Sequence, residues 1–191
     1  MARPRSFDPD DVLEIARQMF WQRGFQATSL DEITAASGIA KPSLYAAFGD
    51  KNALFLKVLD RYHDGILGWA ERVLAQPGPA REAIRQWLIG FVPYCSGEQG
   101  QRGCLSINSL TDGSLEQAAV RQSIDRYNKR LEELLRARLR GDRAAFGKGF
   151  DPDITAYTIM VVHSGLMALA HRAPDSKRVK AVIDQVMQLL D

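Results

Sequence analysis

The chain has 191 residues and a net charge of +2, and hydrophobic and charged residues make up 46% and 25% of it. This balance is that of an ordinary globular protein, long enough for one domain or two small ones. The first residues, MARPRSFDPDD, hold no apolar run, and no window approaches the roughly 18 continuous apolar residues of a membrane span. We therefore expect a cytoplasmic protein with no membrane partner.

Cysteine and histidine are too sparse for a disulfide framework or a metal site. The two cysteines are Cys95 and Cys104, and the chain contains no CxxC pair. The three histidines, His63, His163 and His171, show no metal-ligand spacing. We expect neither a metal nor another cofactor, and a reducing compartment.

Bulk charge gives no indication of nucleic-acid binding. Residues 1–62 carry eight basic and eight acidic side chains, so the strongly basic domain typical of many DNA-binding proteins is absent. Any case for DNA must therefore rest on where individual charges lie.

The first expected helix begins at Asp8-Pro9, because aspartate caps helices and proline suits the first turn. Apolar residues then recur at helical spacing until Gly24, where we expect the helix to stop.

Two short helices follow within residues 29–48. Ser29 and Glu32 form the pattern of a capping box, and Gly38 ends the helix that they open. After two further residues, Pro42 fits the first turn of a second short helix, which runs to Phe48.

The remainder also shows helical patterning, and no segment shows sustained period-two alternation, so we predict an all-α fold. A long helix is expected from Asp50 to Leu74, and the break at residues 76–79 is the most evident linker. Further helices are expected over about 80–95, 104–110, 115–139, 151–172 and 176–190.

Residues 29–48 have the pattern of a helix-turn-helix. In that motif the second helix lies in the major groove while the first crosses the DNA backbone. The same pattern also fits two short core helices of any helical bundle. The side chains that we expect to contact DNA lie at the two helix starts and at the beginning of the next helix: Thr28, Ser29, Lys41, Pro42, Ser43, Tyr45 and Lys51.

The register of residues 8–62 resembles the N-terminal domain of TetR-type (tetracycline-repressor-like) regulators. The resemblance rests on these positions: Phe20, Gly24, Phe25, Thr28, Ser29, Ile33, Ala36, Gly38, Lys41, Leu44, Tyr45, Phe48, Lys51 and Leu54. It implies an N-terminal three-helix DNA-binding domain, a homodimer, a two-fold symmetric double-stranded operator and a C-terminal domain that binds a small molecule.

By the same resemblance, Thr28, Lys41, Pro42, Ser43, Tyr45 and Lys51 match positions that contact DNA in the family. One departure follows the tyrosine, where many members carry an aromatic residue or histidine and this chain has Ala46 and Ala47. That departure removes potential contacts with the DNA backbone.

The segment Gly103–Asn108, GCLSIN, resembles one branch of the family in which some members sense electrophiles through a cysteine. Cys104 is then either a small apolar core residue or a sensing thiol. A Cys104→Ser variant that still binds DNA but is no longer released by an electrophile would identify the thiol as the sensor.

The expected effector-binding part is helical and rich in aromatic residues. Candidates to line a mostly apolar pocket are Trp69, Trp87, Phe91, Tyr94, Cys104, Asn108 and Tyr157, although each also fits plain core packing. His163 is interpreted as a satisfied core or interface histidine. The last two helices carry apolar residues on broad faces, which favours a four-helix dimer interface.

We therefore predict a DNA-binding domain over residues 1–62 and a helical effector-binding and dimerisation domain over residues 63–191. The predicted function is that of a transcriptional repressor, not an enzyme, which an unknown small molecule releases from a palindromic operator. The alternatives are a repressor that senses through Cys104, a helical interaction module that does not bind DNA, and a small hydrolase using Cys104 and His163. The hydrolase lacks any recognisable orienting residue or oxyanion loop.

Overall fold

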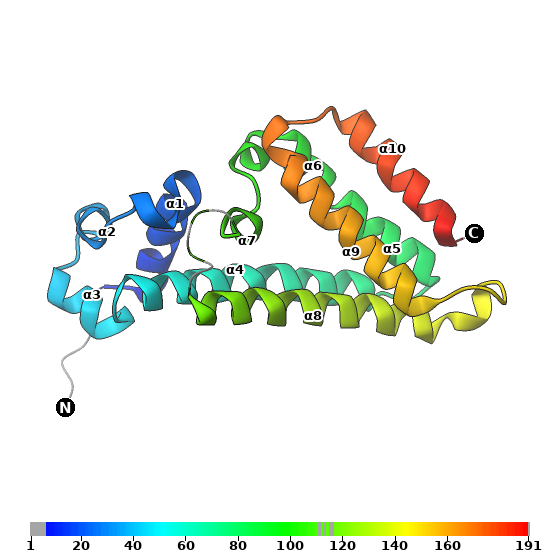
Figure 1. Cartoon of the computed structure of the whole chain (residues 1–191), viewed down its shortest axis with the longest axis horizontal. Helices are drawn as coiled ribbons and strands as arrows, with labels where there is room; N and C mark the ends of the chain where they lie inside the picture. Colours follow the sequence, from blue (N-terminus) through cyan, green and yellow to red (C-terminus); the bar gives the residue numbers. More distant parts are fainter. Residues whose placement is uncertain (1–6, 111, 113, 115–116, 191) are drawn as a thin grey trace. The chain divides into compact units, whose positions relative to one another are not determined.

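The computed structural model describes residues 7–110, 112, 114 and 117–190, and within these residues every regular element is helical (Figure 1). The predicted all-α fold is confirmed. The chain divides into two compact units, which we call the first and second units. The first comprises the described residues of Met1–His63 and Asn108–Ile124, and the second comprises Asp64–Ile107 and Asp125–Asp191. The predicted domain division between residues 62 and 63 stays a prediction. The first unit differs from the predicted DNA-binding domain in that it also includes described residues of Asn108–Ile124.

The first unit contains four N-terminal helices: α1 (Pro9–Ala27), α2 (Leu30–Ser37), α3 (Lys41–Phe48) and the start of α4 (Lys51–Leu74). The Asp8 carboxylate accepts a hydrogen bond from the Asp10 amide at 2.9 Å and caps α1. Regular helix ends at Gly24, as predicted, and one more turn continues to Ala27.

The helix-turn-helix forms for the local reasons that the sequence indicates. Ser29 and Glu32 make both bonds of the capping box, each accepting from the other's backbone amide. Gly38 ends α2 with a φ of 68°, a left-handed conformation that favours glycine. Leu44 and Phe48 then turn the buried side of α3 inward.

An aromatic core lies behind this motif. Phe20 contacts Phe55 edge-to-face with ring centroids 5.0 Å apart, and Phe25 lies 5.0 Å from the same ring. The Asp112 carboxylate accepts a hydrogen bond from the Phe25 amide at 3.1 Å. Ser123 adds a second link within the unit, because its hydroxyl donates to Asp60. Residues far along the chain therefore complete the packing of the N-terminal helices.

The second unit contains the rest of α4 and most of the remaining helices. Its elements are α5 (Ala80–Ile89), α6 (Val92–Ser96), η1 (Glu98–Arg102), α7 (Leu105–Asn108, which ends in the first unit), most of α8 (Ala118–Gly141), η3 (Arg143–Ala145), α9 (Pro152–Leu169), η4 (Ala170–Arg172), α10 (Ser176–Met187) and η5 (Gln188–Leu190). Helix α10 packs against α5, α6 and α9 (Figure 1).

Three predicted helix limits differ from the structure. The helix expected over 80–95 is broken into α5 and α6, because Pro93 has no amide to donate and its ring crowds the preceding turn. The short helix expected over 104–110 is confined to Leu105–Asn108. The next helix begins at Ala118, and residues 115 and 116, where it was expected to start, lie outside the described residues.

Helix α9 with η4 (Pro152–Arg172) is long and apolar enough, by length and composition alone, to cross a membrane, with a mean hydropathy of 1.3. The sequence expectation that no segment approaches a span missed it. The core helix of a soluble protein passes the same test, so this finding is weak evidence for a membrane.

Candidate DNA-binding surface

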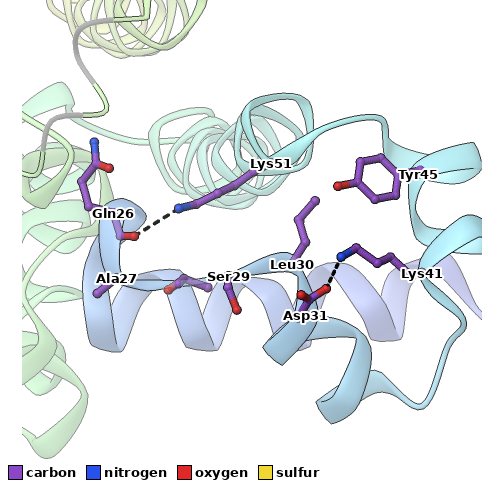
Figure 2. A pocket seen from close by; sticks show the side chains of 9 residues that line it. Gln26, Ala27, Ser29, Leu30, Asp31, Lys41, Tyr45 and Lys51 are labelled. Carbon is purple, nitrogen blue, oxygen red and sulfur yellow. Dashed lines mark hydrogen bonds and ion pairs between the residues drawn. The ribbon is translucent and has the colours of Figure 1, made fainter.

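A surface depression of about 380 Å³ lies where α2, α3 and α4 begin (Figure 2). Its lining gathers five of the seven side chains predicted to contact DNA and four further residues. These nine are Gln26, Ala27, Thr28, Ser29, Leu30, Asp31, Lys41, Tyr45 and Lys51. The other two predicted residues, Pro42 and Ser43, lie on the first turn of α3, where Pro42 is exposed and Ser43 is half-buried.

Tyr45 and Lys41 project from α3 beside the depression. The Tyr45 side chain is 45% exposed, so its ring and its hydroxyl can be reached from solvent. The Lys41 ammonium forms an ion pair with the Asp31 carboxylate, with Nζ and Oδ1 2.6 Å apart (Figure 2). This bond raises the pKa of Lys41 above its ordinary value.

Lys51 supplies a second cation from the first residue of α4. Its ammonium donates to the Gln26 carbonyl at 3.2 Å and lies 4.5 Å from the centroid of the Phe25 ring. Partial burial lowers the pKa of Lys51 from its usual range. The C-terminal end of α1 therefore holds the Lys51 side chain at the rim of the depression.

Thr28 and Ser29 lie at the predicted place, but both hydroxyls already have partners within the protein. Thr28 is 1% exposed, and its hydroxyl donates to the Gly24 carbonyl at 2.9 Å. Ser29 donates to the Glu32 carboxylate at 2.9 Å. In this structure the two hydroxyls fix the start of α2. The exposed polar residues that line the depression come from α1, from α2 and its cap, and from α3: Gln26, Ser29, Asp31, Lys41 and Tyr45.

Three hydrogen-bond or ion-pair partners at or behind this surface were not predicted from the sequence. Asp31 holds Lys41, Gln26 holds Lys51, and Asp112 accepts from the Phe25 amide. The spacing of Asp31 from Lys41 is ten residues, which no local pattern marks as a pair. Asp112 is further still from Phe25 in sequence, so only the folded chain reveals it.

The predicted ligand-pocket residues do not all gather at one place. The Phe91 ring contacts both Trp69 and Trp87. The Tyr94 hydroxyl instead donates a hydrogen bond to the Gly103 carbonyl at 2.7 Å. Tyr157 lies exposed on α9. Asn108 is half-buried at the end of α7.

The interpretation of His163 as a satisfied core or interface histidine stays a prediction. Its ring contacts both Trp87 and Phe91, and neither nitrogen has a hydrogen-bond partner among the described residues.

Both cysteines are free and buried. Cys104 is 6% exposed, and its role as a sensing thiol stays a prediction. Burial raises the pKa of the Cys95 thiol to about 11, so this cysteine is protonated and unreactive at neutral pH.

These observations define a helix-turn-helix protein with an exposed tyrosine and two lysines at the start of its second and following helices. A family model described as "Bacterial regulatory proteins, tetR family" matches residues 12–58. The uncharacterized HTH-type transcriptional regulator YezE of Bacillus subtilis is 30% identical over 198 residues, which span all of both chains. The chain therefore belongs to the tetR family and is a DNA-binding transcriptional regulator.

Other relatives agree with this assignment. The HTH-type transcriptional repressor ComR of Escherichia coli is 34% identical over 110 residues, which cover 57% of this chain and 52% of ComR. A solved structure of a cysteine mutant of the TetR family regulator CifR, complexed with 26bp double-strand operator DNA, is 32% identical with a TM-score of 0.85. That match covers 97% of this chain and 98% of CifR.

Proposed function

We propose that the chain is a dimeric repressor that binds a palindromic operator and releases it when a small molecule binds the second unit. The observation that carries the DNA-binding part is the exposed Tyr45 beside Lys41 and Lys51 at the start of α3 and α4. Its support is the likeness, over nearly the whole chain, to a regulator that was solved on operator DNA. We further propose that it acts in the cytoplasm, where its operator would lie.

In this proposal α3 enters the major groove, with Lys41, Pro42, Ser43 and Tyr45 facing the DNA. Lys51 contacts a phosphate, which its side chain reaches by leaving the Gln26 carbonyl. Thr28 and Ser29 position the start of α2 against the backbone of the DNA, and their hydroxyls keep their partners within the protein. Phosphate contacts release counterions, so affinity falls steeply with salt.

The test is a shift assay with the region upstream of the chain's own gene, against unrelated DNA of equal length. We expect Lys41→Ala and Tyr45→Ala each to weaken specific binding by about 1–3 kcal/mol, because each removes a contact at the recognition helix. Lys129→Ala is the matched control, since it removes the same charge from an exposed position of α8. If the double variant binds as tightly as the parent, α3 is not the recognition helix.

The dimer is proposed from an apolar surface on the last two helices. Five large apolar side chains there are more than half exposed, and an apolar patch of this kind marks an interaction surface. They are Ile154, Tyr157, Val161 and Leu169 of α9, and Leu189 beyond α10. A second copy of the chain would cover them in a two-fold arrangement, the commonest one in oligomers.

Val161→Asp tests this interface without disturbing the protomer, because Val161 is exposed in the single chain. We expect sedimentation velocity to show monomers, since an unpaired charge in an apolar interface is costly. Gln122→Glu adds the same charge at an exposed site on α8 and should leave the dimer intact. A Val161→Asp protein that sediments like the parent would exclude this interface.

A further inference from the structure

Four rings meet inside the second unit, and we call Trp69, Trp87, Phe91 and His163 the aromatic cluster. They come from α4, α5, the residue after Gly90, and α9. Phe91 is the centre, with ring centroids 4.9 Å from Trp69, 5.2 Å from Trp87 and 4.6 Å from His163. Trp87 and His163 are also direct neighbours, with centroids 5.1 Å apart.

The unusual feature of the aromatic cluster is its unpaired polar atoms. Trp87 is fully buried and His163 is 6% exposed. The Trp87 Nε1 and both ring nitrogens of His163 have no hydrogen-bond partner among the described residues. Buried polar groups in native proteins nearly always have partners, because an unmade hydrogen bond costs about 1–3 kcal/mol. Three such atoms on two touching rings therefore require a partner that the described residues do not provide.

The protonation state of His163 fixes what that partner must offer. Burial lowers the pKa of His163 to about 4, so the imidazole is neutral at pH 7. A neutral imidazole has one donor and one acceptor nitrogen, and the indole of Trp87 is a donor. A single group that both accepts and donates can therefore satisfy two of the three atoms, the indole N–H of Trp87 and the unprotonated nitrogen of His163.

Packing around the aromatic cluster holds these rings in place. A Cβ atom at Gly90 would lie 2.3 Å from Cζ2 of Trp69, so any side chain there would force the Trp69 ring to move. The edge-to-face contacts of Phe91 with both tryptophans restrain its ring further. Rings held in this way are suited to recognise a ligand at little conformational cost.

We propose that the aromatic cluster binds the effector, and that this effector is a small neutral molecule with an apolar body and a hydroxyl group. The hydroxyl accepts from Trp87 Nε1–H and donates to the unprotonated nitrogen of His163. The apolar body lies against the rings of Phe91 and Trp69. A carboxylate is disfavoured, because the aromatic cluster offers no cation to offset its desolvation. The regulatory role of this ligand rests on the proposed function, whereas the binding of the ligand to the aromatic cluster does not.

The test compares three probes of similar size on the full chain without DNA: phenol, toluene and benzoate. Isothermal titration calorimetry should show phenol binding about tenfold tighter than toluene, since only phenol meets the unpaired nitrogens. Benzoate should show no measurable binding. Equal binding of phenol and toluene, or no binding of either, would overturn the proposal and leave buried water as the partner of these nitrogens.

Variants then locate the preference. His163→Phe and Trp87→Phe should each remove most of the preference for phenol while toluene still binds. His163→Gln retains a donor and an acceptor and should keep part of the preference. Trp21→Phe, which changes a tryptophan of the first unit, is the matched control and should bind all three probes like the parent. A phenol preference that survives in His163→Phe and in Trp87→Phe would contradict the site.

A shift assay with the same probes separates this proposal from the proposed function. If phenol binds the aromatic cluster but does not release the operator, the ligand site stands and the regulatory role of that site is wrong. If the chain binds its operator but phenol and toluene bind equally, the DNA-binding function stands and the ligand site is wrong.

Discussion

Polar side chains at the two sites stand in opposite situations. At the candidate DNA-binding surface, Lys41 and Lys51 already have partners within the protein, an aspartate and a backbone carbonyl. In the aromatic cluster, the nitrogens of Trp87 and His163 have none among the described residues. A ligand of the first site must replace existing bonds, whereas a ligand of the second site adds bonds that were missing.

Affinity therefore arises differently at the two sites. Exchange of one partner for another at an exposed surface changes the free energy little for each contact, so DNA affinity must be built from many contacts and from counterion release. A bond newly made to a buried polar atom removes a desolvation penalty, so one hydroxyl group can distinguish between ligands.

The largest expected effect comes from removing the core beneath the DNA-binding surface. Phe20→Ala should lower the free energy of unfolding by about 3–5 kcal/mol, because it deletes a fully buried ring that contacts Phe25 and Phe55. Urea denaturation measures the loss. Phe146→Ala removes the same ring from a half-buried pair with Phe150 in the second unit and should cost far less. Similar losses for both variants would contradict this account of the core.

The next largest expected effect is a pH dependence of the free energy of unfolding that arises from His163. The pKa of His163 is about 4 in the folded chain and about 6.5 when unfolded, so the unfolded state binds the extra proton first. Stability from this residue is therefore complete above pH 6.5 and is lost as the pH falls towards 4, by about 3 kcal/mol. Urea denaturation between pH 4 and 7 measures it.

His163→Phe is the variant that isolates this titration. It should remove the part of the pH dependence that belongs to His163, and it should be at least as stable as the parent at pH 7, because the two unpaired imidazole nitrogens are gone. A variant with the same pH profile as the parent would show that His163 has a partner that keeps it titrating normally.

The smallest effect concerns the exchange of partners at the surface. Asp31→Asn removes the carboxylate that pairs with Lys41, so the lysine is free for DNA and one repulsive charge is lost. We expect operator binding to tighten about two- to fivefold at low salt, and less at high salt. Asp125→Asn makes the same charge change on α8 and is the control. Weaker binding by Asp31→Asn would show that the aspartate orients Lys41 for contact.

Local signals in the sequence were sufficient for the helix-turn-helix. The limits of α2 and α3 could be predicted because each depends on residues close by in sequence. These are the capping box of Ser29 with Glu32, the helix end at Gly38 and the helix start at Pro42. Pro93 is a signal of the same kind, yet the sequence prediction of one helix over about 80–95 does not include the break between α5 and α6.

The partners of the functional side chains could not be predicted, because they come from distant parts of the chain. His163 lies 76 residues after Trp87 in sequence, and whether its nitrogens find partners depends on how α5 and α9 pack. Sequence reasoning could identify which aromatic residues were candidates for a pocket. Only the folded second unit shows that Tyr157 lies on the surface and that His163 replaces it among the rings.

The hydrogen bond from the Phe25 amide to Asp112 has a consequence for exchanging parts between related regulators. The described residues of Met1–His63 are continuous in sequence, yet they form one unit with the described residues of Asn108–Ile124, which also provide Ser123 for Asp60. A hybrid that joins these 63 residues to a foreign effector domain would lose both bonds unless its new neighbour supplied them. Grafts that also transfer residues 108–124 should keep the parent's operator preference, whereas an N-terminal graft alone should fold poorly.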